Sequence, residues 1–225
     1  MHKIFGLFGL LLTGCLFAQS TEEKRLKAAG DVLHEIMEVK DKAIPQGLLD
    51  SSECTVIVPS LKKGAFFLGG KYGKGFFTCR NANGDGWGSP ASIIVEGGSL
   101  GFQVGGSESD VILLVMNKKG ASRLLSSQFK LGGEASVAAG PVGRTSSAQT
   151  DALLTAEILS YSRSRGIFMG ISLEGSTLRQ DLDGNKELYG KTMTNKEIIE
   201  GNPKPPAGAS LLLADLNKYS PRKGK

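Results

Sequence analysis

Histidine is almost absent from this sequence of 225 residues, which contains only His2 and His34. Catalytic triads and most zinc sites depend on histidine, so a single histidine outside the N-terminal leader argues against both. The sequence also lacks a GxSxG nucleophile elbow and paired CxxC motifs. Gly184–Thr192 resembles a phosphate-binding loop, but five residues separate its glycines where the motif needs four. We therefore expect that the protein is not an enzyme and that it has no cofactor and no metal site. A hydrolase that uses carboxylates alone ranks last among our hypotheses.

Long apolar runs are also missing, apart from one that is too short to span a bilayer. Ile4–Leu12 follows Lys3 and precedes small residues, the layout of a bacterial secretory signal. Two cleavage sites compete: a lipoprotein pattern that would acylate Cys15, and ordinary cleavage after Ser20. Ser20 also has the spacing of a helix cap with Glu23, which favours the lipoprotein. We expect residues 1–20 to hold the signal, and the chain to be exported, either periplasmic or envelope-anchored as a lipoprotein, or otherwise secreted.

Cysteine is scarce as well, since only Cys54 and Cys79 follow the leader. Export would place both in an oxidising compartment, where two thiols of one domain are reasonably paired as a disulfide. Two buried free thiols are the alternative.

The charge balance is modestly basic. Loss of the leader removes only Lys3 from the formal net charge of +5 and leaves +4. This charge allows contact with anionic surfaces, but it falls short of the concentration that nucleic-acid binding usually shows, so we expect no nucleic-acid partner.

Glycine is abundant, with 31 residues, and it recurs inside segments that alternate like β-strands. Glu96–Asn117 predicts an antiparallel strand pair turning at Gly105–Ser107, and Ile158–Leu173 predicts a second hairpin with Arg163–Gly166 at its tip. Glycine-kinked antiparallel strands favour a strongly coiled or barrel-like sheet. The predicted fold class is α+β, a β-rich sheet with an N-terminal amphipathic helix and short C-terminal helices.

The N-terminal helix is predicted over Thr21–Ala43 from its apolar face. Its polar face is mixed in sign, which favours packing on the domain's own core over lying on an anionic bilayer. A short helix or turn is predicted over Lys118–Gln128, and short helices are predicted from Thr194 to Gly201 and within Ala209–Lys225. We expect one domain over residues 21–202, followed by a proline-containing basic tail over 203–225.

Basic residues gather in segments that resemble turns. Lys62 and Lys63 lie in one, Lys71 and Lys74 in the next, and Arg163 and Arg165 at the predicted hairpin tip. They are either solvated loop charges or the parts of one cationic rim.

Four segments together resemble the SYLF family, also described as the yeast-type actin-binding module. They are CTVIVPSLKKGAFFLGGKYGKGFFTCR, EGGSLGFQVGGSESDVILLVMN, KLGGEASVAAGPVGR and EILSYSRSRGIFMGISLEGSTL. The similarity extends from about Leu26 to Ile199.

The resemblance implies a non-enzymatic module that binds phospholipid membranes, with phosphoinositide and actin binding in eukaryotic relatives. For this chain it implies contact between anionic headgroups and Lys62, Lys63, Lys71, Lys74, Arg163 and Arg165. An exported bacterial protein would meet phosphatidylglycerol and cardiolipin rather than phosphoinositides or actin, so we expect an anionic membrane as partner and no actin. The alternative is a structural or protein-interaction module of the envelope.

Overall fold

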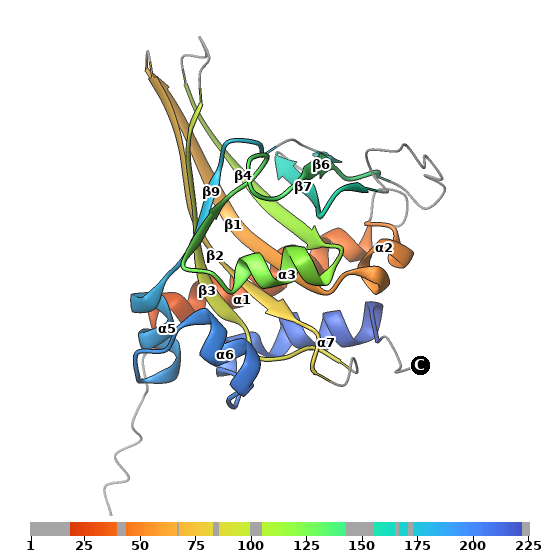
Figure 1. Ribbon diagram of the computed structural model, residues 1–225, viewed down its shortest axis with the longest axis vertical. Helices are drawn as coiled ribbons and strands as arrows, with labels where there is room; N and C mark the ends of the chain where they lie inside the picture. The colour runs from red at the N-terminus through yellow and green to blue at the C-terminus, as the bar shows by residue number, and fades with distance from the viewer. Residues whose placement is uncertain are drawn as a thin grey trace, which may run out of the picture.

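Figure 1 shows the computed structural model of the chain, in which residues 19–39, 44–66, 68–82, 86–99, 105–142, 155–164, 167–170 and 173–221 are described. The helices are α1 Thr21–Glu38, α2 Gln46–Ser51, α3 Lys118–Leu124, α5 Leu182–Tyr189, α6 Asn195–Gly201 and α7 Ser210–Tyr219, with a 3-10 turn at Ala207–Ala209. The strands are β1 Cys54–Phe66, β2 Leu68–Cys79, β3 Ala91–Ser99, β4 Gly105–Val115, β5 Gln128–Lys130, β6 Val137–Ala139, β7 Ile158–Ser164, β8 Ile167–Gly170 and β9 Thr177–Gln180.

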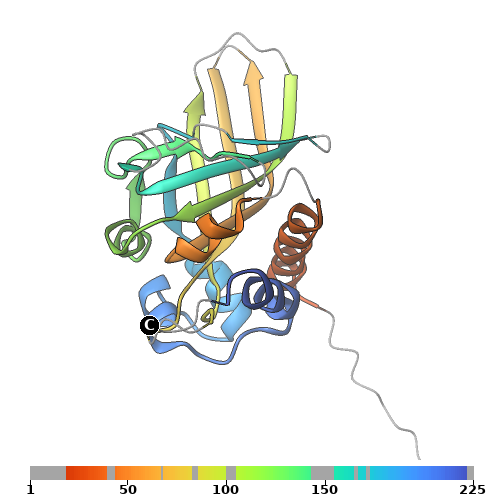
Figure 2. The same cartoon turned by 90° about the vertical axis from the view of Figure 1, so that its right-hand side faces the viewer.

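All of these strands belong to one sheet that curls into a half-barrel (Figures 1 and 2). Eight of them follow the order β5-β9-β3-β2-β1-β4-β7-β6, and β8 pairs with β7. Every pairing is antiparallel except that of β6 with β7, so the sheet is mixed. The predicted α+β class with a curled sheet is confirmed.

The predicted strand pair within Glu96–Asn117 is wrong. Its two halves are β3 and β4, but β2 and β1 lie between them in the sheet. Gly105–Ser107, the expected turn, opens β4, and residues 100–104 lie outside the described residues. Alternation identifies strands but carries no information about their partners. The second predicted hairpin is confirmed as β7 paired with β8.

Strands β1 and β2 are longer than the sequence suggested, and the basic segments expected as turns lie inside them. β1 continues past Pro59 because the ladder shifts register there: Val58 pairs with Val111, and pairing resumes at Leu61 with Ser109. Ser60 in this bulge has φ 57°, and its backbone N–H donates a 3.0 Å hydrogen bond to Asp110 Oδ1. A bulge takes up the additional residue without ending the strand.

The two faces of the sheet carry separate cores. On one face, which we call the α1 face, α1 and α7 pack over Ile57, Phe76 and Ile112. On the other, which we call the α3 face, Val56, Phe77 and their neighbours pack against Leu124 of α3 and Ile198 of α6. Period-two alternation along β1, β2 and β4 supplies both sets.

Helix α1 packs on the core as predicted. Leu26, Ala29 and Leu33 are fully buried, and Ser20 caps the helix by accepting a hydrogen bond from the backbone N–H of Glu23. The helix ends at Glu38 rather than Ala43, because Val39 is already extended. Helix α7, beyond the proline-containing segment, buries Leu212 and Leu216 in the same core.

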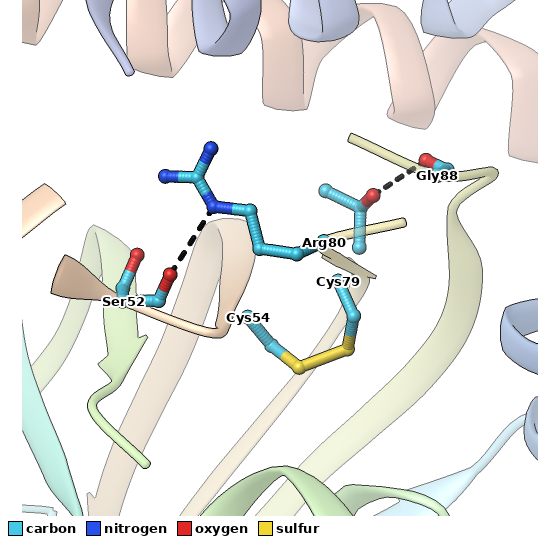
Figure 3. Close-up of a disulfide and its surroundings, with 6 residues drawn as sticks. Ser52, Cys54, Cys79, Arg80 and Gly88 are labelled. Atoms are coloured by element: carbon cyan, nitrogen blue, oxygen red, sulfur yellow. Dashed lines mark hydrogen bonds between the residues drawn. A yellow bond between two sulfur atoms is a disulfide. The ribbon is translucent and has the colours of Figure 1, made fainter. Parts of the chain in front are cut away.

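The base of the β1–β2 hairpin is tied by a disulfide between Cys54 and Cys79, which are direct partners in the ladder (Figure 3). The next residue, Arg80, is buried; its guanidinium lies 4.1 Å from the centre of the Trp87 ring. Its donors reach the backbone carbonyls of Leu49, Asp50, Ser52 and Ser220. Arg80 therefore joins α2 and the end of α7 to the sheet.

Candidate functional site

Four strand ends extend together beyond the helices at one end of the sheet (Figures 1 and 2). We call this part the blade: Leu61–Lys74 of β1 and β2 with the described ends Glu96–Ser99 of β3 and Gly105–Glu108 of β4. Its residues align in rows across the strands. The rows are Glu96, Tyr72, Lys62 and Glu108; then Gly97, Lys71, Lys63 and Ser107; then Gly98, Gly70, Gly64 and Gly106.

Lys63 and Lys71 are direct cross-strand partners on the α3 face of the blade. Both side chains are half-buried, and a Cβ added at Gly97 would lie 3.2 Å from Cε of Lys71. Desolvation, followed by the charge of Lys63, lowers the pKa of Lys71. Among the described residues neither lysine forms a salt bridge. Like charges directly opposite each other destabilise a sheet, so this pair is electrostatically unsatisfied.

Lys62 and Lys74 lie on the opposite, α1 face, and their surroundings differ. Lys62 is exposed. Nζ of Lys74 lies 2.7 Å from Asp181 Oδ2 and 3.4 Å from Glu22 Oε1. Burial alone would lower the pKa of Lys74, but hydrogen bonding and charge from Asp181, with the charge of Glu22, raise it. Lys74 therefore links the sheet to α1 and α5.

Of the remaining predicted basic residues, only Arg163 lies within the described part of the chain, and it is not a free charge. Arg163 donates to Asp110 Oδ2 at 2.8 Å and also pairs with Glu35 of α1. Arg165 and Cys15 lie outside the described residues. The five of these basic residues that the structure describes thus do not form one rim: two lysines face each side of the sheet, and Arg163 is held by carboxylates.

A pocket of about 380 Å³ lies at the foot of the blade on the α1 face. Its lining includes Arg25, Ser60, Lys62, Tyr72, Lys74 and Glu108. Sequence reasoning missed Arg25, Tyr72 and Glu108. Had Leu68–Cys79 been recognised as one strand, the spacing of two between Tyr72 and Lys74 would have placed both on one face.

Within the described residues, no helix is long and apolar enough to cross a membrane. The same part of the chain contains no group of three or more histidine, cysteine or acidic side chains placed to hold a metal ion.

Comparison with known proteins places the chain in a family. Residues 96–219, more than half of the chain, match the Ysc84 family, described as "Las17-binding protein actin regulator". The chain belongs to the Ysc84 family, which includes the SYLF domain. This confirms the resemblance found in the sequence. The family is a non-catalytic binding module, associated with membrane lipid and actin in eukaryotes.

Three relatives illustrate the similarity. The chain is 34% identical over 180 residues to "Protein YSC84" of Saccharomyces cerevisiae, covering 78% of this chain and 38% of that protein. It is 32% identical to "SH3 domain-containing protein PJ696.02" of Schizosaccharomyces pombe, covering 88% and 47%. It is 28% identical to the human "SH3 domain-containing YSC84-like protein 1", covering 89% and 60%. The Ysc84-type chain therefore spans about half the length of these relatives.

Proposed function

We propose that this Ysc84-type chain is a non-enzymatic phospholipid-binding module that contacts anionic headgroups through the lysines of the blade. The observation that carries the proposal is the Lys63–Lys71 pair. The two half-buried lysines are direct cross-strand partners, and neither has a carboxylate partner among the described residues. A phosphate placed between them would replace their repulsion by two charge-assisted hydrogen bonds.

The blade offers few lysines to a membrane, so its affinity for the membrane depends on the charge of the headgroups. Lys62, Lys63 and Lys71 are the blade cations without salt bridges among the described residues. Each contributes roughly 1 kcal/mol near an anionic surface, and salt screens that contribution. In this proposal Lys74 of β2 and Arg163 of β7 keep their carboxylate partners rather than touching lipid.

We also propose that the protein is exported to a bacterial envelope, with the anionic lipids of that envelope as its partner and no role for actin. The Cys54–Cys79 disulfide supports an oxidising compartment. If Cys15 is acylated, the six residues to Thr21 span at most about 20 Å, which would keep the start of α1 close to the bilayer.

Sedimentation with vesicles of graded phosphatidylglycerol content tests the lipid proposal. We expect binding to rise with anionic content, to fall with salt, and to be strongly reduced by the double change Lys63→Glu and Lys71→Glu. The matched control is Lys118→Glu with Lys204→Glu, which changes the net charge equally at two exposed lysines away from the blade.

Equal losses in both double variants would show that only net charge matters, and would reject the blade as the contact. Unchanged binding to neutral vesicles, or no binding at all, would instead favour the protein-interaction module.

A further inference from the structure

The pocket at the foot of the blade has the size of a small-molecule site. Its volume of about 380 Å³ lies within the range of roughly 300–1,000 Å³ common for ligand pockets. One wall is the first part of α1, the others are the strands β1, β2 and β4, and the bulge at Ser60 forms part of the lining. The ligand that it fits is indicated by the charges in the lining.

Two of the three cations in the lining are already neutralised. Arg25 pairs with Glu22, one turn earlier in α1. Lys74 pairs with Asp181 and, at 3.4 Å, with Glu22. Glu22 and Asp181 are buried, so an approaching anion would experience their negative charge with little screening. The pocket therefore attracts an anion less than a count of its cations suggests.

The charges that remain are one of each sign. Lys62 and Glu108 are direct cross-strand partners of β1 and β4, and both are exposed. Neither forms a salt bridge in the described part of the chain. An exposed ion pair contributes little to stability even when it does form, so a ligand can engage both groups at little cost. Tyr72, on the other side of Lys62, is 49% exposed and presents its ring beside them.

We propose, as a refinement that rests on the lipid-binding function, that this pocket binds a phosphoethanolamine group. The phosphate lies against Lys62, the lining cation without a salt bridge among the described residues, and the ammonium lies against Glu108 and the ring of Tyr72. A purely anionic headgroup would bring its charge against Glu108 without compensation, so the pocket favours a zwitterion. The blade lysines on the α3 face and this pocket on the α1 face thus have different headgroup preferences.

The geometry of the pocket is fixed by contacts outside it. Ser60 holds φ 57° because its N–H is bonded to Asp110, and Asp110 is in turn bonded by Arg163. A non-glycine residue in this region is strained and persists only where its surroundings enforce it. The bonds of Asp110 therefore hold the bulge that lines the pocket in this conformation.

Calorimetric titration with soluble headgroups tests the proposal. We expect glycerophosphoethanolamine to bind at least about tenfold more tightly than glycerophosphoglycerol, which lacks the ammonium. Glu108→Gln should remove this preference, and Lys62→Ala should weaken the binding of both ligands. Lys204→Ala is the matched control, because it removes the same charge at an exposed lysine outside both the pocket and the blade. Equal or reversed affinities, or equal effects of Lys62→Ala and Lys204→Ala, would overturn the assignment.

Vesicles separate a lipid headgroup from a free phosphoethanolamine. Adding phosphatidylethanolamine to vesicles of fixed phosphatidylglycerol content should increase sedimentation of the wild type and not of Glu108→Gln. Increased sedimentation identifies the lipid headgroup as the ligand. Binding of soluble glycerophosphoethanolamine without increased sedimentation supports the pocket as a site for a free phosphoethanolamine compound. If glycerophosphoethanolamine fails to bind while sedimentation still depends on Lys63 and Lys71, the pocket assignment is wrong and the proposed membrane function stands.

Discussion

Lys71 in strand β2 and Arg80 directly after it show two opposite environments for a positive charge in a folded chain. Arg80 is buried, stacks on Trp87 and donates to four backbone carbonyls, so its charge is solvated by the protein. Lys71 is half-buried opposite Lys63, without a salt bridge in the described part of the chain. The first arrangement stabilises the fold, whereas the second costs stability and leaves a site for an anion.

The change Lys71→Met separates these two effects. It keeps most of the apolar stem over Gly97 and removes the ammonium. We expect it to raise the free energy of unfolding by about 0.2–1 kcal/mol, the usual range for a cross-strand pair, and to weaken binding to anionic vesicles. Urea denaturation and sedimentation measure the two quantities. A loss of both stability and binding would contradict this account, and Lys204→Met is the control.

The stability gain from Lys71→Met should depend on pH. The pKa of Lys71 is lowered in the folded chain from its ordinary value of 10.5. Between the two values the unfolded chain binds more protons, so the stability of the wild type rises with pH. The wild type is therefore less stable than Lys71→Met by the full amount below the folded-state pKa of Lys71. This difference in the free energy of unfolding disappears as pH rises through about 10.5. A pH series of denaturation curves checks this, and a deficit that grows on alkalinisation would refute it.

Arg80→Lys should be strongly destabilising although the charge is kept. A lysine ammonium has fewer donors than the planar guanidinium and cannot reach all four carbonyls. It also cannot stack on the Trp87 ring as the guanidinium does. Lost hydrogen bonds to a charged group cost about 1.5–3 kcal/mol each, so we expect a loss of at least that size in urea denaturation. Arg179→Lys, which affects only a half-exposed salt bridge with Glu96, is the comparison and should cost less than about 1 kcal/mol.

At the scale of elements, the hairpin of β1 and β2 is closed at its base by the disulfide, which joins cysteines 25 positions apart in the sequence. In the chain-entropy account a loop of this length stabilises by about 3 kcal/mol. Replacing both cysteines by serine should lower the free energy of unfolding by about that amount and should leave vesicle binding by the folded protein intact. Reduction of the wild type with a thiol reagent should reproduce the loss, and an unchanged denaturation midpoint would contradict it.

The elements that the sequence predicted well are those set by local signals. The Ser20 cap, the reciprocal bonds of Thr194 and Glu197 at the start of α6, and the β7–β8 hairpin all follow from neighbouring residues. The pairing of β3 and β4 failed because partner choice depends on distant strands, here β1 and β2. The lysine segments were predicted as turns because glycine and lysine disfavour strands; the ladder and the Ser60 bulge outweigh that preference.

The candidate site was less predictable than the fold. The sequence identified Lys62, Lys63, Lys71 and Lys74, but whether each is free depends on contacts far along the chain. Lys74 is paired with residues 52 and 107 positions away, Glu22 and Asp181. No local pattern contains that information.

At the scale of the whole molecule, α7 completes the core over α1. Leu212 and Leu216 are buried there, and Ser220 accepts from Arg80. A chain ending at Asn202 should therefore lose cooperative unfolding, since burial of one such leucine contributes about 2–5 kcal/mol. A chain ending at Pro221 keeps these contacts and should unfold like the full sequence. Circular dichroism during heating compares the two, and a cooperative transition in the shorter chain would refute the role of α7.

The glycine row of the blade has a mechanical consequence. Gly98, Gly70, Gly64 and Gly106 align across four strands, and a Cβ added at three of them would meet no atom of the described residues within 4 Å. Side chains standing on a sheet resist its flexing by touching their neighbours. We expect a row without side chains to bend more easily than the rows beside it, so that the strand ends beyond it tilt to match a surface while the disulfide-tied base keeps its angle.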